Sequence, residues 1–335
     1  MRHYRLSAKY ERRTKAMNEA LPGDLHRIAV IGAGTMGWQI AALAAAHGHP
    51  VALFDVAPEA VRRAHALLQS ELPAVLAQGV WPGSVDTIIA GISAAGSLSE
   101  AVTGADLVIE AVKEDLTVKR AVFADLSKAS PDAILATNSS SLPSARLADV
   151  VADPSRLLNL HFFAPIWVRP MLEVMSSGHT EPAIIDACAR WGRSLGLTVA
   201  ICQGQSMGFI INRIWRAVKR ESLRVVDEGH ADPEDIDRLW MRFFGSDFGP
   251  FGMMDTVGLD TVADIEASYV AVSPDPTERI STMLRQLVEE GRLGEKTGRG
   301  FYEYPDPAYR HPDFLTSSGR ADAAEDSPGH LAGPR

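Results

Sequence analysis

The stretch IAVIGAGTMG, residues 28–37, joins an apolar run to three closely spaced glycines. Its first four residues form a continuous apolar run, as a strand buried on both faces requires. Gly32, Gly34 and Gly37 follow, and the helix-forming run GWQIAALAAAHG begins at the last of them. In such a unit the first glycine permits a tight turn, the second lets backbone approach a pyrophosphate, and the third allows close helix packing. The stretch therefore predicts a dinucleotide-binding turn, in which we expect Thr35 and Met36 to contact the ligand as well.

A second apolar segment, VALFD, supports this prediction because it ends in an acid. Asp55 lies 18 residues after Gly37, a spacing that suits a carboxylate gripping the adenosine ribose hydroxyls. Such an acid disfavours a phosphate on that ribose, so we expect NAD rather than NADP as the cofactor. A glycine-rich turn that holds no ligand is the alternative interpretation.

Further apolar segments continue the pattern along the first half of the chain. Strands are expected at 106–112, 133–139, 156–163 and 197–202, and helical segments alternate with them. This alternation predicts an α/β fold with a Rossmann-type, doubly wound and mostly parallel sheet.

The pattern changes after Gln205 to helical spacing of apolar residues. One helix is expected over 206–229, a second after the N-cap Asp232, and a third over 278–291. These helices predict an all-helical C-terminal domain. The expected organisation has four parts: a mobile N-terminal extension (1–24), an NAD-binding Rossmann domain (25–205), a helical dimerisation and substrate domain (206–304) and a disordered tail (305–335).

Composition narrows the classes of partner and compartment. The chain has 335 residues, 46% of them hydrophobic, and a formal net charge of -9. An acidic chain is a poor match for nucleic acid, because binding phosphates needs a basic face. The two cysteines fit neither a metal site nor a disulfide framework, and no run of about 18 apolar residues occurs. We therefore expect a soluble cytoplasmic protein without metal, nucleic-acid or membrane partners; translation from Met17 is an alternative start.

The stretch HFFAPIWVRPMLEVM, residues 161–175, contains the candidate catalytic pair. His161 and Glu173 stand on two apolar runs that Pro165 and Pro170 separate by a turn. Histidine exchanges a proton near neutral pH, and a carboxylate can fix its tautomer. We interpret the two as a base and its orienting acid; a structural histidine near a surface acid is the alternative.

Seven motifs in order carry a resemblance to a known family. They are GAGTMG, DLVIEAVKEDLTVK, TNSSSL, HFFAP, LEV, GFIINR and GEKTGRGFY. Across residues 27–304 the chain resembles the 3-hydroxyacyl-CoA dehydrogenase family. The resemblance implies an NAD-binding domain joined to a helical domain that forms most of a homodimer interface, with the substrate between the domains.

The resemblance also implies roles for single residues. His161 matches the family's base, Glu173 its partner carboxylate, Ser140 the serine that contacts substrate and cofactor, and Asn212 the amide that holds the substrate. Ser140 could otherwise be a capping serine, as could Ser139 or Ser141.

Three further positions match residues that contact the cofactor in the family: Glu114, Lys119 and Lys296. The loop around Lys296 reads from its spacing alone as a solvated turn, so its role depends on the resemblance.

Two departures from the family pattern concern substrate binding. Ala164 stands where the family has an asparagine that contacts the thioester portion of the substrate. Between Asp55 and Lys113 the permanent cations are Arg62 and Arg63, where the family supplies lysine near the CoA phosphates. Both departures imply that the contacts with the substrate are changed.

These observations predict NAD-dependent oxidation of a 3-hydroxyacyl thioester to the 3-oxoacyl thioester, or the reverse, with a small-molecule CoA thioester as partner. Two variants keep the chemistry but take the acyl group from a carrier protein or as a free hydroxy acid. A non-catalytic dinucleotide-binding protein is the alternative from another class. A non-catalytic protein has no physical reason to keep all four proposed catalytic groups.

Overall fold

A computed structural model describes residues 25–271, 273 and 275–316. Contacts within the chain divide it into two compact units, Met1–Ile211 and Asn212–Arg335. The division falls later than the boundary expected at 205. The expected N-terminal extension lies outside the described residues, as does the part of the expected tail from 317 onward.

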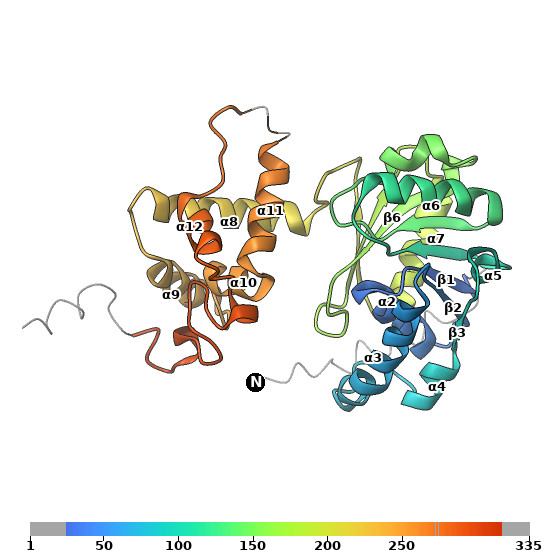
Figure 1. Cartoon of the computed structure of the whole chain (residues 1–335), viewed down its shortest axis with the longest axis horizontal. Helices are drawn as coiled ribbons and strands as arrows, with labels where there is room; N and C mark the ends of the chain where they lie inside the picture. Colours follow the sequence, from blue (N-terminus) through green and yellow to red (C-terminus); the bar gives the residue numbers. More distant parts are fainter. Residues whose placement is uncertain (1–24, 272, 274, 317–335) are drawn as a thin grey trace, which may run out of the picture. The chain divides into compact units, whose positions relative to one another are not determined.

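The first unit is built on an eight-stranded sheet (Figure 1). Its order is β3-β2-β1-β4-β5-β6-β7-β8, and every neighbouring pair is parallel except β6 and β7. The strands are β1 (Ile28–Ile31), β2 (Val51–Phe54), β3 (Ile92–Ala94), β4 (Leu107–Glu110), β5 (Ile134–Thr137), β6 (Leu157–Phe162), β7 (Met171–Ser176) and β8 (Thr198–Cys202). The predicted α/β, mostly parallel, doubly wound sheet is confirmed.

Helices cover both faces of the sheet, as Figure 1 shows. They are α2 (Thr35–Ala46), α3 (Pro58–Ala77), α4 (Val85–Ala90), α5 (Leu98–Val102), α6 (Leu116–Ala129) and α7 (Pro182–Ser194), with the 3-10 helices η1 (Ser144–Val150) and η2 (Pro154–Arg156). Alternate residues of a strand point to opposite faces. Ile28 and Val30 accordingly belong to an apolar cluster that includes residues of α2, α3, α4 and α7, whereas Ala29 and Ile31 belong to a second cluster with residues of α5, α6 and η1.

The second unit is helical around a separate apolar core. It contains α8 (Ile211–Asp227), whose first residue still belongs to the first unit, then α9 (Pro233–Phe244), α10 (Pro250–Val257), α11 (Leu259–Val270), α12 (Thr282–Glu289), η3 (Glu295–Thr297) and η4 (Ala308–Arg310). Asp232 caps α9 as predicted, by accepting from the N–H of Asp235 at 2.9 Å. The predicted all-helical C-terminal part is confirmed.

Two of the predicted helices begin later than expected. The helix expected from residue 206 starts at Ile211, because Gly208 and Phe209 have φ values of 75° and 54°, outside the helical region. The helix expected from 278 starts at Thr282, where the hydroxyl of Ser281 caps it by accepting from the N–H of Leu284.

The expectation of disorder from residue 305 is wrong for residues 305–316. Tyr309 and Phe314 are buried in the core of the helical unit, and the ring of Tyr309 packs edge-on against Tyr302. The short segment is rich in polar residues, but its two aromatic side chains bury enough apolar surface to order it.

Candidate active site

The loop between β1 and α2 is a tight turn in which backbone packing demands glycine at two positions. Gly32 has a φ of +105°, and its N–H donates to the carbonyl oxygen of Phe54 at 2.7 Å. A Cβ on Gly32 would lie 2.6 Å from the carbonyl oxygen of Ala111, and a Cβ on Gly37 would overlap the carbonyl oxygen of Gly32. The two glycines therefore close β1, β4 and α2 against one another.

Gly34 differs because its missing side chain leaves open space before the amino-terminal end of α2. A Cβ there would meet no heavy atom of the chain within 4 Å, and the backbone is extended. Thr35 is exposed, and the first turn of α2 contains no acidic residue. The free N–H groups and positive end of the helix fit a pyrophosphate in that space.

Asp55 lies beside this turn at the carboxyl end of β2. Its Oδ2 accepts from the N–H of Ala33 and its Oδ1 from the N–H of Ala57, both at 2.9 Å. Each carboxylate oxygen retains a lone pair for another donor. The side chain can therefore hold the glycine turn and still accept from ribose hydroxyls.

His161 and Glu173 form a buried hydrogen-bonded pair. β6 and β7 are antiparallel, and their register places the two residues directly opposite each other. His161 Nδ1 lies 2.9 Å from Glu173 Oε2, and the residues are 5% and 3% exposed. A carboxylate can only accept, so Nδ1 carries the proton and Nε2 is left as the basic nitrogen.

The carboxylate and the imidazole of this pair have further neighbours. Glu173 Oε1 accepts from the N–H groups of Ile210 and Ile211 at 3.1 and 2.8 Å. The ring centroids of Phe163 and Phe209 lie 4.3 and 5.0 Å from that of His161. Every oxygen of the carboxylate is thus bonded, and aromatic rings constrain the imidazole.

The predicted site residues of the first unit gather at one edge of the sheet. β1, β2, β4, β5 and β6 are parallel, so their carboxyl ends meet there. The glycine turn, Asp55, Glu114 and Ser140 follow the ends of β1, β2, β4 and β5, and His161 lies next to last in β6. The structure therefore brings the candidate base to the edge that carries the dinucleotide turn.

Ser140 is the exposed member of a run of three serines whose other two are held by Glu114. The hydroxyls of Ser139 and Ser141 donate to Glu114 Oε1 at 2.5 and 2.7 Å. Ser139 Oγ also accepts from the N–H of Leu142 at 2.8 Å. Glu114 thus fixes the loop after β5 and leaves Ser140 as the serine presented at its surface.

Lys119 does not stand at the surface where a cofactor could touch it. It is 1% exposed, and its ammonium pairs with Glu110 at 2.8 Å and with Glu114 at 3.2 Å. Burial alone would raise the pKa of Glu114, but the charge of Lys119 and the two serine hydroxyls outweigh it and lower that pKa. The structure thus holds the ammonium of Lys119 against Glu110 and Glu114, and its contact with the cofactor stays a prediction.

Glu110 is a member of this network that sequence reasoning missed. It is fully buried and accepts from Thr137 Oγ1 at 2.7 Å and from the N–H of Val112 at 2.7 Å. An acid within the apolar strand segment, nine residues before a lysine, was the available signal. The carboxylate ties the ends of β4 and β5 to α6 beneath the serine loop.

Two of the predicted residues belong to the helical unit. Asn212 lies in the first turn of α8. Lys296 lies in η3, and its ammonium contacts Asp260 Oδ1 and Oδ2 at 2.5 and 2.6 Å. Their contacts with cofactor or substrate remain predictions.

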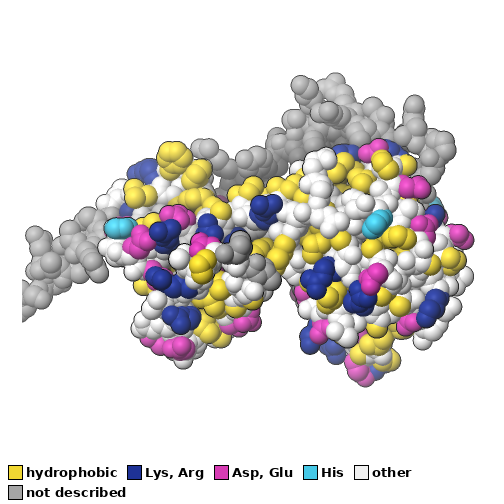
Figure 2. Space-filling model, turned by 90° about the horizontal axis from the view of Figure 1, so that it is seen from above, with side chains coloured by type: hydrophobic (Ala, Val, Ile, Leu, Met, Phe, Trp, Pro, Cys, Tyr) yellow, Lys and Arg dark blue, Asp and Glu magenta, His cyan; other side chains and the backbone are white. Residues whose placement is uncertain are grey.

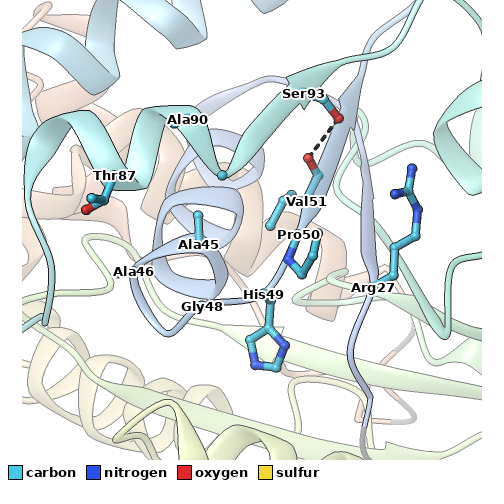
Figure 3. Close-up of a pocket in the computed structure, with 11 residues that line it drawn as sticks. Arg27, Ala45, Ala46, Gly48, His49, Pro50, Val51, Thr87, Ala90 and Ser93 are labelled. Atoms are coloured by element: carbon cyan, nitrogen blue, oxygen red, sulfur yellow. Dashed lines mark hydrogen bonds between the residues drawn. The ribbon is translucent and has the colours of Figure 1, made fainter.

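A pocket of about 560 Å³ lies at the other edge of the sheet (Figure 3). Its lining includes Arg27, Pro50 and Gly91, which directly precede β1, β2 and β3. Within it the hydroxyl of Ser93 donates to the carbonyl oxygen of Val51. This pocket is therefore distinct from the dinucleotide turn, which follows the carboxyl ends of the same strands.

No group of three or more His, Cys, Asp or Glu side chains among the described residues could hold a metal ion. Among the helices of the same residues, none is both long and apolar enough to cross a bilayer.

The doubly wound sheet, together with the edge that carries both the glycine turn and the His161–Glu173 pair, defines a dinucleotide-dependent oxidoreductase. Residues 27–205 match the NAD binding domain of 3-hydroxyacyl-CoA dehydrogenase, and residues 208–304 match its C-terminal domain. The 3-hydroxybutyryl-CoA dehydrogenase of Mycobacterium tuberculosis is 34% identical over 284 residues, covering 84% of this chain and 99% of the relative. The chain belongs to the 3-hydroxyacyl-CoA dehydrogenase family and is an NAD-dependent oxidoreductase.

Solved structures agree with this assignment. The (S)-3-hydroxybutyryl-CoA dehydrogenase of Ralstonia eutropha has a TM-score of 0.78 and 29% identity, over 84% of this chain and all of the other. A diketoreductase, described as acting on dicarbonyl compounds, has a TM-score of 0.76 and 32% identity, over 84% and 99% of the two chains. The fold thus occurs with both thioester and other carbonyl substrates.

Proposed function

We propose that the protein interconverts a 3-hydroxyacyl thioester and the 3-oxoacyl thioester, with His161 as base in oxidation and acid in reduction. The observation that carries this proposal is the buried hydrogen bond between His161 and Glu173 on the sheet edge of the glycine turn. NAD supplies the hydride acceptor when bound.

The proton transfer falls to His161 Nε2. The Nδ1–H donates to Glu173, which leaves Nε2 to take the proton of the substrate hydroxyl. The imidazolium that results is stabilised by the carboxylate, and the amides of Ile210 and Ile211 keep that carboxylate in place. In the reverse direction the same nitrogen returns the proton to the carbonyl oxygen.

Other residues bind and orient. We propose that Ser140 and Asn212 donate to the substrate oxygen, so that it stays aligned for hydride transfer. The turn from Gly32 to Gly37 and Asp55 hold the pyrophosphate and ribose. Glu114 and Lys296 are proposed to contact the cofactor; Glu114 also keeps the serine loop in place.

A free dicarbonyl or hydroxy acid is the second candidate substrate. Ala164 offers no side-chain amide to a thioester, and its carbonyl oxygen already accepts from the guanidinium of Arg169. Arg62, one of two exposed arginines on α3, is paired with Glu59. The diketoreductase relative, 32% identical, supports this candidate. An acyl group on a carrier protein is a variant of the first.

The discriminating experiment follows NADH oxidation with acetoacetyl-CoA, with the same acyl group on a carrier protein, and with free acetoacetate. The proposal expects kcat/KM for acetoacetyl-CoA to exceed that for acetoacetate by at least about tenfold, because CoA adds binding contacts. Equal values for thioester and free acid would exclude a thioester-specific site. No oxidation of NADH with any of the three would favour a non-catalytic protein.

We further propose that the protein is a homodimer. Leu239, Phe243 and Phe244 on α9 are exposed, Phe243 by 83%, and the two phenylalanine rings pack against each other. Hydrophobic side chains reach the molecular surface in Figure 2. Exposed apolar clusters mark interfaces. Light scattering should give twice the chain mass; a monomer at micromolar concentration would contradict the proposal.

We propose a reducing compartment, the cytoplasm, as its location. Cys188 and Cys202 are buried and form no disulfide, and burial raises the pKa of the Cys188 thiol to about 12. Cysteines that form no disulfide are typical of a reducing environment. Fractionation of cells that express the full chain tests the location.

A further inference from the structure

Phe209 has an unusual backbone conformation next to the candidate base. Among the described residues it is the non-glycine residue with positive φ, at 54°, and it follows Gly208 at 75°. A bulky side chain in the left-handed region is strained, and such strain persists only where surrounding structure enforces it. A glycine would adopt this conformation without strain. We therefore expect the phenylalanine side chain to have a role that offsets the backbone strain.

The ring of Phe209 lies against His161. It is 2% exposed, and its centroid is 5.0 Å from that of the imidazole, with 30° between the planes. Phe209 belongs to a small buried cluster with Met175 and Cys202. Phe163 approaches the imidazole as well, at 4.3 Å. Rotation of the imidazole away from Glu173 would therefore require both rings to move.

The backbone conformation of Phe209 affects Glu173, the hydrogen-bond partner of His161. The N–H of Phe209 donates to the carbonyl oxygen of Ser206 at 3.1 Å, and Ser206 Oγ donates to the carbonyl oxygen of Phe209 at 3.2 Å, which closes the turn. Next to a residue in the left-handed region, successive backbone N–H groups can converge on an anion. The next two amides, of Ile210 and Ile211, indeed converge on Glu173 Oε1.

We propose that Phe209 is a positioning residue for the base: its ring holds the plane of the His161 imidazole, and its left-handed backbone aims two amides at Glu173. The proposal rests on the proposed dehydrogenase function, in which Nε2 of that imidazole exchanges the substrate's proton. Substrate and cofactor are not expected to touch Phe209 for this role.

The test compares Phe209→Leu, Phe209→Gly and Phe209→Tyr with a matched control, Phe251→Leu, which truncates a fully buried phenylalanine in the core of the helical unit. The readouts are kcat and KM with acetoacetyl-CoA and NADH, the pH profile of kcat, and the NMR resonance of the His161 Nδ1–H. The Leu variant loses the ring, the Gly variant loses the ring and the strain, and the Tyr variant keeps the ring.

Phe209→Leu and Phe209→Gly should each lose on the order of 10- to 100-fold in kcat, because a base displaced by about 1 Å costs that much. KM should change less than kcat, the pH profile should move, and the Nδ1–H resonance should shift or broaden. Phe209→Tyr should retain most of the wild-type rate, and Phe251→Leu should leave the pH profile and the resonance unchanged.

Two results would overturn the proposal. One is an unchanged kcat, pH profile and Nδ1–H resonance in Phe209→Leu; the other is the same set of changes in Phe251→Leu. If Phe209→Leu does not fold, Phe209→Gly takes its place, since glycine removes the backbone strain. If the wild type turns over no substrate, the proposed function fails, but the Nδ1–H resonance still decides whether Phe209 holds the imidazole.

Discussion

Replacing Glu173 by glutamine should disable the base, His161, while the size and shape of the replaced side chain stay nearly the same. The glutamine has one acceptor oxygen, while the carboxylate serves three donors: His161 Nδ1 and the amides of Ile210 and Ile211. If the oxygen stays with the two amides, the NH₂ group faces Nδ1. Nδ1 must then accept, so the proton moves to Nε2, the atom that should take the proton of the substrate.

The expected loss can be given a magnitude. General acid–base catalysis by a positioned side chain contributes about 10² to 10⁴ in rate, which corresponds to about 2.7 to 5.4 kcal/mol of barrier at 1.36 kcal/mol per factor of ten. Exchanging a charged acceptor for a neutral one should cost about 1 to 2 kcal/mol in the free energy of unfolding. The increase in the activation barrier should therefore exceed the loss in the free energy of unfolding.

The assay is steady-state reduction of acetoacetyl-CoA, with NADH binding measured in parallel by fluorescence. Glu278→Gln is the matched control, because this largely buried acid pairs with Arg216 in the helical unit and lies in none of the proposed machinery. Glu173→Gln should bind NADH like the wild type and lose turnover; Glu278→Gln should keep it. A kcat for Glu173→Gln within threefold of the wild type would show that Glu173 does not orient the base.

Two further predictions concern the glycine turn and the serine loop. Gly34→Ala should melt like the wild type but bind NADH at least about tenfold more weakly, because its Cβ enters space left for the pyrophosphate; Gly37→Ala should fail to fold or lose several degrees in Tm, since its Cβ overlaps backbone. Equal effects on folding by the two variants would contradict the assignment. The lowered pKa of Glu114 means that its charge stabilises the fold above its ordinary value, 4.5, and that this stability is lost as the pH falls through the folded value. The Tm difference between wild type and Glu114→Gln should therefore be present at pH 7 and shrink below about pH 4.5; a difference that grows on acidification would show that the sign is wrong.

Much of the sheet and of the candidate site could be predicted from local patterns in the sequence. The apolar run at 28–31, the glycine spacing and Asp55 are consequences of one strand–turn–helix unit, so they could be predicted together. The pairing of His161 with Glu173 could be predicted because two turn-forming prolines separate two apolar runs, which favours an antiparallel return. Strand β3 has three residues, Ile92–Ala94, and is too short to give a pattern.

The structural features that the sequence did not predict depend on tertiary contacts. Glu110 lies in an apolar strand segment, and its burial is tolerable only because Lys119 and Thr137 reach it from other elements. The positive φ of Phe209 leaves no trace in residue type, since phenylalanine is not a residue that favours it. Likewise, Tyr309 found its partners in a core that the preceding helices build.

The role of His161 as the base is tested by the turnover number of His161→Ala, measured beside its affinity for NADH. This variant should bind NADH within about threefold of the wild type, because the glycine turn and Asp55 are untouched, and its kcat should fall by about 10² to 10⁴. If it binds NADH and reduces acetoacetyl-CoA at a rate close to that of the wild type, His161 is not the base.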